Sequence, residues 1–160
     1  MSNAQFFKAC LVNELRATHD VIAALPTDQL EYRPHPVNRS AYQIAEHIIA
    51  HVFDLEIILT QTVCDEILSY PFESPIDAAA EMKAKWDHVI HLFDQLDEST
   101  WDSVPVELKI QGQHFLTIPR SQMMWFFFFD IIHHRGQLTT YIRPMGGKNP
   151  GVYGPSADTV

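Results

Sequence analysis

Four consecutive phenylalanines, Phe126 to Phe129, lead directly into a polar stretch that contains Asp130, His133, His134 and Arg135. Polar groups beside so apolar a run are costly to bury unless a partner satisfies them. On a helix, Asp130 and His134 share one face because they stand four residues apart. A metal ion is a partner that would hold both side chains. Such a site needs a third ligand from elsewhere in the chain.

Four long amphipathic segments account for most of the 160 residues. Apolar residues recur close to helical spacing in residues 6–25, 40–67, 75–96 and 119–145. Ser40, with Gln43 three residues later, is typical of a capping box, and Ser74 followed by Pro75 is typical of a helix start. These segments predict an all-α fold, a four-helix bundle, in a single domain over residues 1–160.

The segment between the third and fourth helices has a different pattern. Apolar residues alternate between Val104 and Ile118, and Gln111-Gly112-Gln113 is typical of a turn. We therefore expect a long crossover here, with a short hairpin or an extended stretch as alternatives.

Metal sites in helical bundles are formed inside, by side chains from facing helices. His47 is the candidate for the third ligand. It lies in the second helix beside Ile44 and Ile48, near the apolar stripe. With Asp130 and His134 it would make a set of two histidines and one carboxylate that leaves coordination positions open, as catalytic metal sites do. Non-haem iron uses the same set, so these residues do not identify the metal.

Each of these residues also has an ordinary structural interpretation. His47 could be a hydrogen-bonded core residue, since buried polar groups usually find such partners. Asp130 could pair with Arg135 or with a lysine on another helix, and Arg135 would then be structural. His51 lies one turn after His47 and could bind the metal instead of it or beside it. His133 points about a hundred degrees away from its neighbour, which favours a supporting or surface position.

Four adjacent phenylalanines cover all sides of a helix. At least one of the residues 126–129 should therefore lie outside the core of the monomer. A contact between two copies of the chain would bury it, so we expect a homodimer.

The charge and the cysteine content restrict the partners and the compartment. The formal net charge of −9 argues against a large nucleic-acid surface and against adsorption to anionic membranes. The apolar run 123–129 is far shorter than the ~20 residues that span a bilayer. The two cysteines form no CxxC pair, and the chain begins without a signal-like segment. We expect a cytoplasmic protein that acts on a small molecule, with neither nucleic acid nor membrane as partner.

Two motifs resemble those of a known family. The run from Asp130 to Arg143, DIIHHRGQLTTYIR, is similar to the C-terminal signature of the DinB/YfiT-like metalloenzymes. The segment 40–48, SAYQIAEHI, is similar to the second-helix motif of that family, whose His is a metal ligand. The resemblance covers nearly the whole chain. It implies a four-helix bundle, commonly dimeric, that binds a divalent metal such as zinc or nickel through three histidines.

Carried over to this chain, the resemblance makes His47 and His134 metal ligands and places the third histidine of the family at Asp130. Aspartate is an acceptable ligand, so the metal site could persist with an altered preference that includes iron or manganese. The site could equally be weakened or empty.

The same resemblance assigns supporting roles around the ligands. Gly136 would allow close helix approach, while Arg135 and Gln137 would make polar contacts around the site. Glu46, His51 and His133 are further candidates to support the ligands.

Relatives of known activity include S-transferases and isomerases that use low-molecular-weight thiols. In such enzymes a metal would lower the pKa of the thiol. The resemblance therefore implies a metal-dependent enzyme that activates a thiol or water, of S-transferase or hydrolase type, with a low-molecular-weight thiol as a further cofactor. The alternative is a non-catalytic stress-response or binding dimer with a weakened or lost metal site, which Asp130 favours.

Overall fold

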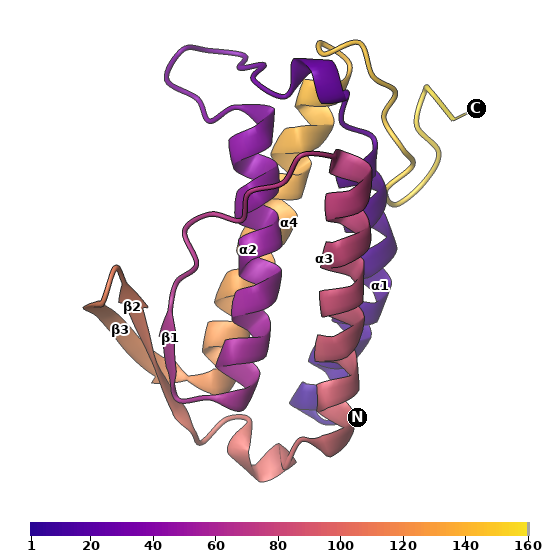
Figure 1. Ribbon diagram of the computed structural model, residues 1–160. Helices are drawn as coiled ribbons and strands as arrows, with labels where there is room; N and C mark the ends of the chain where they lie inside the picture. The colour runs from indigo at the N-terminus through magenta and orange to yellow at the C-terminus, as the bar shows by residue number, and fades with distance from the viewer. Residues whose placement is uncertain (160) are drawn as a thin grey trace.

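Four helices form the body of the protein in the computed structural model, which describes residues 1–159 (Figure 1). Val160, the last residue of the predicted domain, lies outside this range. The helices are α1 (Asn3–Ala23), α2 (Ala41–Thr60), α3 (Pro75–Leu92) and α4 (Arg120–Ile142). α1 and α4 run in one direction along the bundle, and α2 and α3 run in the other. Short 3-10 helices lie at Thr27–Gln29, Phe93–Gln95 and Glu98–Thr100.

The start of α2 follows the predicted capping box, but its end does not follow the prediction. The Ser40 hydroxyl accepts a hydrogen bond from the Gln43 backbone, and the Gln43 side chain accepts one from the Ser40 backbone. α2 ends at Thr60, although the apolar pattern continues to residue 67. The Arg120 guanidinium donates to the carbonyls of residues 58 and 61, at 3.1 and 3.3 Å, and so satisfies carbonyls at the end of the helix.

A three-stranded mixed sheet accompanies the helices, so the predicted all-α fold is wrong. β1 (Val63–Asp65) pairs in parallel with β2 (Pro105–Ile110), which pairs antiparallel with β3 (Gln113–Pro119). β2 and β3 form the hairpin that was one alternative for the crossover. Gln111 and Gly112 make its turn, both with positive φ, 52° and 76°. No sequence pattern indicated β1, because three residues directly after an apolar helix are too few to show alternation.

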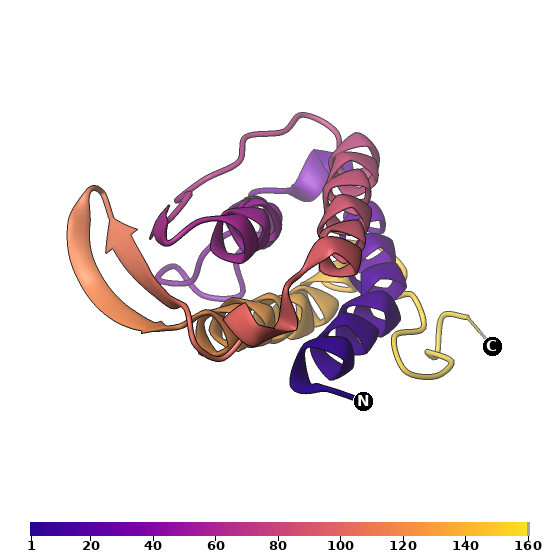
Figure 2. The same ribbon diagram turned by 90° about the horizontal axis from the view of Figure 1, so that it is seen from below.

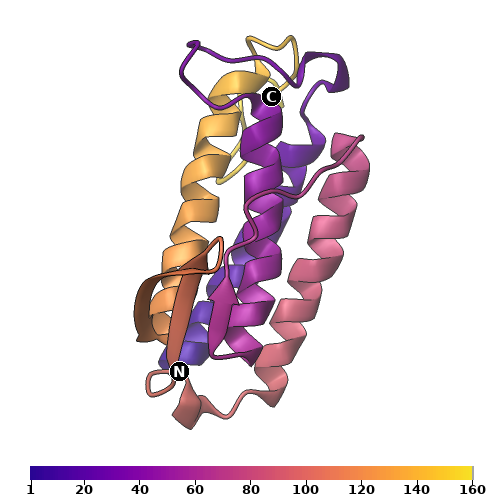
Figure 3. The same ribbon diagram turned by 60° about the vertical axis from the view of Figure 1, so that its left-hand side comes forward.

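The sheet lies beside only one half of the bundle. Seen from below, it curves past α2 and α4 on the side away from α1 and α3 (Figure 2). The hairpin stands in front of the first turns of α4 (Figure 3). The hairpin therefore lies against the α2–α4 side of the bundle, away from α1 and α3.

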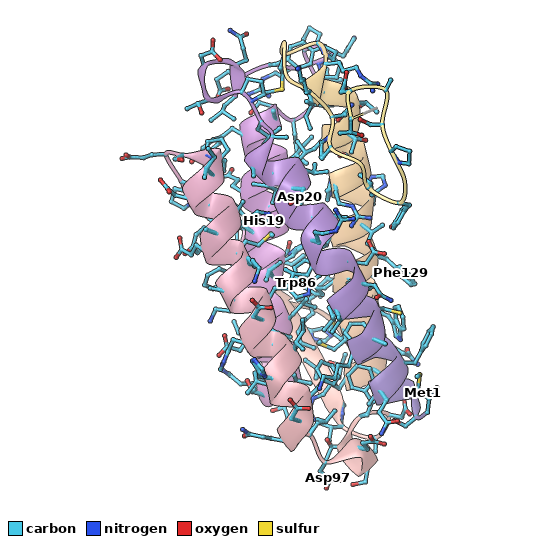
Figure 4. The ribbon with its side chains drawn as sticks, turned by 90° about the vertical axis from the view of Figure 1, so that its right-hand side faces the viewer. Met1, His19, Asp20, Trp86, Asp97 and Phe129 are labelled. Carbon is cyan, nitrogen blue, oxygen red and sulfur yellow. The ribbon has the colours of Figure 1, made fainter. Side chains whose placement is uncertain are left out.

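The interior between α1 and α3 is filled by large apolar side chains. Trp86 of α3 is completely buried, and its indole N–H donates to the carbonyl of Leu11 on α1 at 3.1 Å (Figure 4). Within residues 1–159, no helix combines the length and the apolar character that a membrane span requires.

Candidate metal centre

Four side chains of α2 and α4 meet between the two helices. His47 and His51 stand one turn apart on α2, and Asp130 and His134 stand one turn apart on α4. The Nε2 atoms of His47, His51 and His134 lie 3.1, 3.1 and 3.3 Å from the same atom, Oδ2 of Asp130. Three imidazole nitrogens therefore converge on one carboxylate oxygen.

This cluster contains the three residues that the sequence singled out. Ligand atoms of His47, Asp130 and His134 all lie within 4.8 Å of one another, close enough for one metal ion to bind all three. Ligand atoms of His47, His51 and Glu66 form a second group that meets the same limit. The two groups share His47, so His51 and Glu66 extend the predicted set.

Two of the three imidazole rings are fixed through their other nitrogen. His51 Nδ1–H donates to Asp54 Oδ2 at 3.2 Å, since a buried carboxylate offers only acceptors. His134 Nδ1 lies 2.7 Å from the amide oxygen of Gln137, which makes it a donor as well. In the neutral form of each ring, Nε2 then carries the lone pair that faces Asp130.

Lone pairs that face a carboxylate at this distance repel it unless a proton or a metal ion lies between them. Burial alone would lower the pKa of His51, but hydrogen bonds to Asp130 and Asp54 raise it to about 9. Burial would likewise raise the pKa of Asp130, but hydrogen bonds from the histidines hold it far below its ordinary value. For His47, burial outweighs the hydrogen bond to Asp130, so the pKa of His47 is lowered. The cluster thus attracts positive charge, and a set of three imidazoles and a carboxylate fits a divalent metal ion.

The cluster opens into a cleft of about 310 Å³. Its polar lining comprises Arg39 and Glu66 together with the four clustered side chains. Its apolar lining comes from β2, β3 and α4: Leu108, Ile110, Phe115, Phe126 and Phe127. The sheet that the sequence did not predict therefore supplies one wall of the candidate site.

Gln137 and His133 lie beside the cluster, as candidates to support the ligands. While its oxygen faces His134, the Gln137 amide nitrogen donates to His133 Nε2 at 3.1 Å. His133 itself is exposed on the outer side of α4. Gln137 thus orients His134, and His133 contacts Gln137 rather than Asp130.

Three other residues of the two motifs have different surroundings. Arg135 donates to Glu14 on α1 at 2.6 Å, so it braces the helices and forms no pair with Asp130. Glu46 is not among the residues that line the cleft, and no hydrogen bond joins it to the cluster within residues 1–159. Gly136 is exposed, and a Cβ added there would meet no atom within 4 Å. The role in close helix approach that was predicted for Gly136 is therefore wrong.

Sequence reasoning missed three residues around the site, which are Asp54, Glu66 and Arg39. A signal for Asp54 was present, because it stands three residues after His51 and seven after His47, on the same face of a helix. No comparable signal existed for Glu66, which was assigned to a helix that in fact ends before it.

The four phenylalanines occupy different environments. Phe127 and Phe128 are buried, whereas Phe126 and Phe129 are 51% and 60% exposed, which confirms that at least one lies outside the core. The rings of Phe127 and His51 make an edge-to-face contact, with ring centroids 4.6 Å apart. Phe129 lies on the outside of the bundle (Figure 4).

A four-helix body with a flanking sheet and a histidine-rich cluster between two helices defines a helical protein with a candidate metal centre. The DinB family model matches residues 1–159, and the chain belongs to this family. The chain is 28% identical over 149 residues to the uncharacterized protein YrdA of Bacillus subtilis (strain 168), covering 91% of this chain and 84% of YrdA. The crystal structure of a DinB-like protein of Bacillus subtilis, YjoA, has the same fold, with a TM-score of 0.69 at 17% identity over 93% of this chain and 99% of that chain.

Proposed function

We propose that the protein binds one divalent metal ion through His47, Asp130 and His134, with His51 as a fourth donor. The observation that carries this proposal is the convergence of three Nε2 atoms on one oxygen of Asp130. The hydrogen bonds at Nδ1 of His51 and His134 add to it, because they direct two lone pairs toward the same point.

The proposed activity is metal-dependent activation of a thiol or a water, in an S-transferase or hydrolase reaction. When bound, a divalent ion would act as a Lewis acid that lowers the pKa of such a group. Asp54 and Gln137 hold the rings of His51 and His134 in the required tautomer. The apolar wall of the cleft limits the access of water and leaves room for a small molecule.

Zinc and nickel are the metals that we propose first. Imidazole suits both, and a carboxylate is tolerated beside it. The oxygen of Asp130 also makes iron or manganese suitable, because these metals accept mixed nitrogen and oxygen ligands.

One observation favours a second candidate function, a binding dimer without a metal. Asp130 Oδ2 lies within hydrogen-bond distance of His47, His51 and His134, so a proton on His51 could hold the cluster together. In that case the cleft would bind a ligand without catalysis.

Metal content per chain tests the proposal directly. The untagged protein, purified without chelator and incubated with zinc or nickel, is expected to hold close to one ion per chain by elemental mass spectrometry. His134→Ala should lose the ion and His47→Ala should lose nearly all of it. His133→Ala, one position along the same helix, serves as the matched control and should retain it.

Two outcomes would refute the metal proposal. They are a metal-free wild-type protein after incubation with zinc and nickel, and unchanged metal content in His134→Ala. Metal-loaded protein then enters assays for thiol transfer and for hydrolysis. A bound metal without turnover in either assay would favour the binding function.

A further inference from the structure

Two exposed phenylalanines line the cleft over the metal centre. Phe115 of β3 is 57% exposed and Phe126 of α4 is 51% exposed. A single exposed phenylalanine is ordinary, but apolar side chains gathered in one hollow mark a site for a ligand. Here both rings belong to the same hollow, together with Leu108, Ile110 and Phe127.

Phe115 lines the cleft at a point where the pairing of β2 with β3 is irregular. The register shifts by one residue after the pair Leu108 and Leu116. The next pair joins Lys109 to His114, which leaves Phe115 as the extra residue of a β-bulge. In a regular strand, adjacent side chains point to opposite faces, whereas a bulge re-aims the side chain of the extra residue. The bulge therefore adds an aromatic ring to the cleft that Leu108 also lines.

Phe126 reaches the same cleft from α4. It stands one turn before Asp130, so the two side chains share a face of the helix. One turn rises about 5.4 Å, which is comparable to the length of a six-membered ring with one substituent. Phe129 is also exposed, at 60%, but lies on the outside of the bundle (Figure 4). The helix thus presents Phe126, and not Phe129, to the space beside the metal centre.

The volume of the cleft suits a ring with a small group attached to it. Phe126 contacts Phe127, with ring centroids 5.8 Å apart, whereas Phe115 pairs with no aromatic ring within residues 1–159. The cleft measures about 310 Å³. An apolar cavity of about 150 Å³ already holds benzene. One ring therefore fits beside the phenylalanines and leaves space for a reacting group at Asp130.

We propose that the cleft binds small molecules that carry an apolar ring next to the group that reacts at the metal centre. The ring lies between Phe115 and Phe126, where aromatic side chains offer a large apolar contact area. A hollow of this size suits a small molecule rather than a second copy of the chain, since stable protein contacts cover about 800 Å² on each partner. This proposal rests on the function proposed above and names the class of its substrate.

Two hydroxamates with the same head group and different apolar parts test the ring site. Acetohydroxamate and benzohydroxamate bind zinc through the same two oxygen atoms, and zinc-loaded protein is titrated calorimetrically with each. Benzohydroxamate is expected to bind about 30-fold more tightly, beyond any difference in affinity for free zinc ions, because its ring leaves water for the cleft. Phe115→Ala and Phe126→Ala should each reduce this preference by about three- to tenfold and leave the affinity for acetohydroxamate unchanged.

Phe129→Ala is the matched control. It removes the same ring from the same helix at a comparably exposed position outside the cleft, and it should keep the full preference. Phe115 and Phe126 are more than half exposed, so their removal should leave the fold intact, which circular dichroism checks. Zinc content and sedimentation velocity are measured in the same samples.

The ring proposal would be overturned if the zinc-loaded wild type showed no preference or bound neither hydroxamate. It would also be overturned if Phe115→Ala or Phe126→Ala kept the full preference, or if Phe129→Ala lost as much of it. A Phe126→Ala variant that sediments as a smaller species and keeps the preference would assign this ring to a contact between copies instead. A wild type without zinc refutes the metal proposal, whereas zinc-loaded protein without a preference refutes only the ring site.

Discussion

Replacing Asp54 by asparagine tests how the metal centre is held in place. Asp54 is fully buried, and its Oδ2 accepts from His51 at 3.2 Å. Its Oδ1 accepts from the Ile67 backbone at 3.2 Å and from the Cys64 thiol at 3.6 Å. Asparagine has nearly the same shape but only one oxygen. If this oxygen stays with Ile67 and Cys64, the amide N–H faces His51, which must then accept at Nδ1 and carry its proton on Nε2.

A ring that is protonated at Nε2 cannot bind a metal through that atom. Loss of such a supporting hydrogen bond typically lowers metal affinity by about 10- to 100-fold, or about 1.4–2.7 kcal/mol. We expect a loss in this range for Asp54→Asn rather than a complete loss, because His47, Asp130 and His134 stay in place.

The assay for Asp54→Asn is competition for zinc against a chromogenic chelator at neutral pH. Asp87→Asn, a change of the same chemistry on the exposed side of α3, is the matched control and should bind zinc as the wild type does. Nitrogen NMR of the metal-free protein above pH 9, where the His51 ring is neutral, reports the tautomer of His51 independently. Unchanged zinc affinity in Asp54→Asn, with the proton of His51 still on Nδ1, would refute this account of the site.

Three further predictions concern pH and assembly. His51 binds its proton more tightly in the folded state, with a pKa of about 9 against an ordinary 6.5. Its contribution to the free energy of unfolding is therefore complete below pH 6.5 and is lost as the pH rises through about 9, which urea denaturation of the metal-free protein should show. Zinc affinity should rise over the same interval, because the metal must displace this proton. Phe129, which is exposed and stacks on Trp125 with centroids 5.2 Å apart, is the residue that we expect to contact a second copy. Phe129→Asp should shift the protein toward the monomer in sedimentation velocity, and an unchanged sedimentation coefficient would contradict this prediction.

The metal-ligand candidates could be predicted because their positions depend on local geometry. Asp130 and His134 share a face on any helix, and His47 follows from the apolar stripe of a second helix. The end of α2 could not be predicted in the same way. It depends on Arg120, which is distant in sequence and donates to carbonyls in the last turn. β1 likewise forms because residues 63–65 meet residues 107–109, a pairing that no local pattern encodes.

The role of His51 could not be predicted from the sequence for a different reason. Its spacing placed it near His47, but whether it would be a donor or a support depends on where its ring nitrogens point. That orientation is set by Asp54, whose own position depends on hydrogen bonds from Cys64 and Ile67 beyond the end of the helix. Tertiary contacts therefore decide whether His51 can serve as a metal donor or only as a supporting residue.

The hairpin over the cleft and the cluster beneath it belong to separate parts of the chain. All four clustered side chains come from two helices, whereas Leu108, Ile110 and Phe115 come from β2 and β3. Side chains of the hairpin can therefore be exchanged without altering any atom that would bind a metal. In evolution or in protein engineering, the protein could therefore acquire a different ligand preference through changes in the β2–β3 hairpin alone, while the four clustered side chains stay constant.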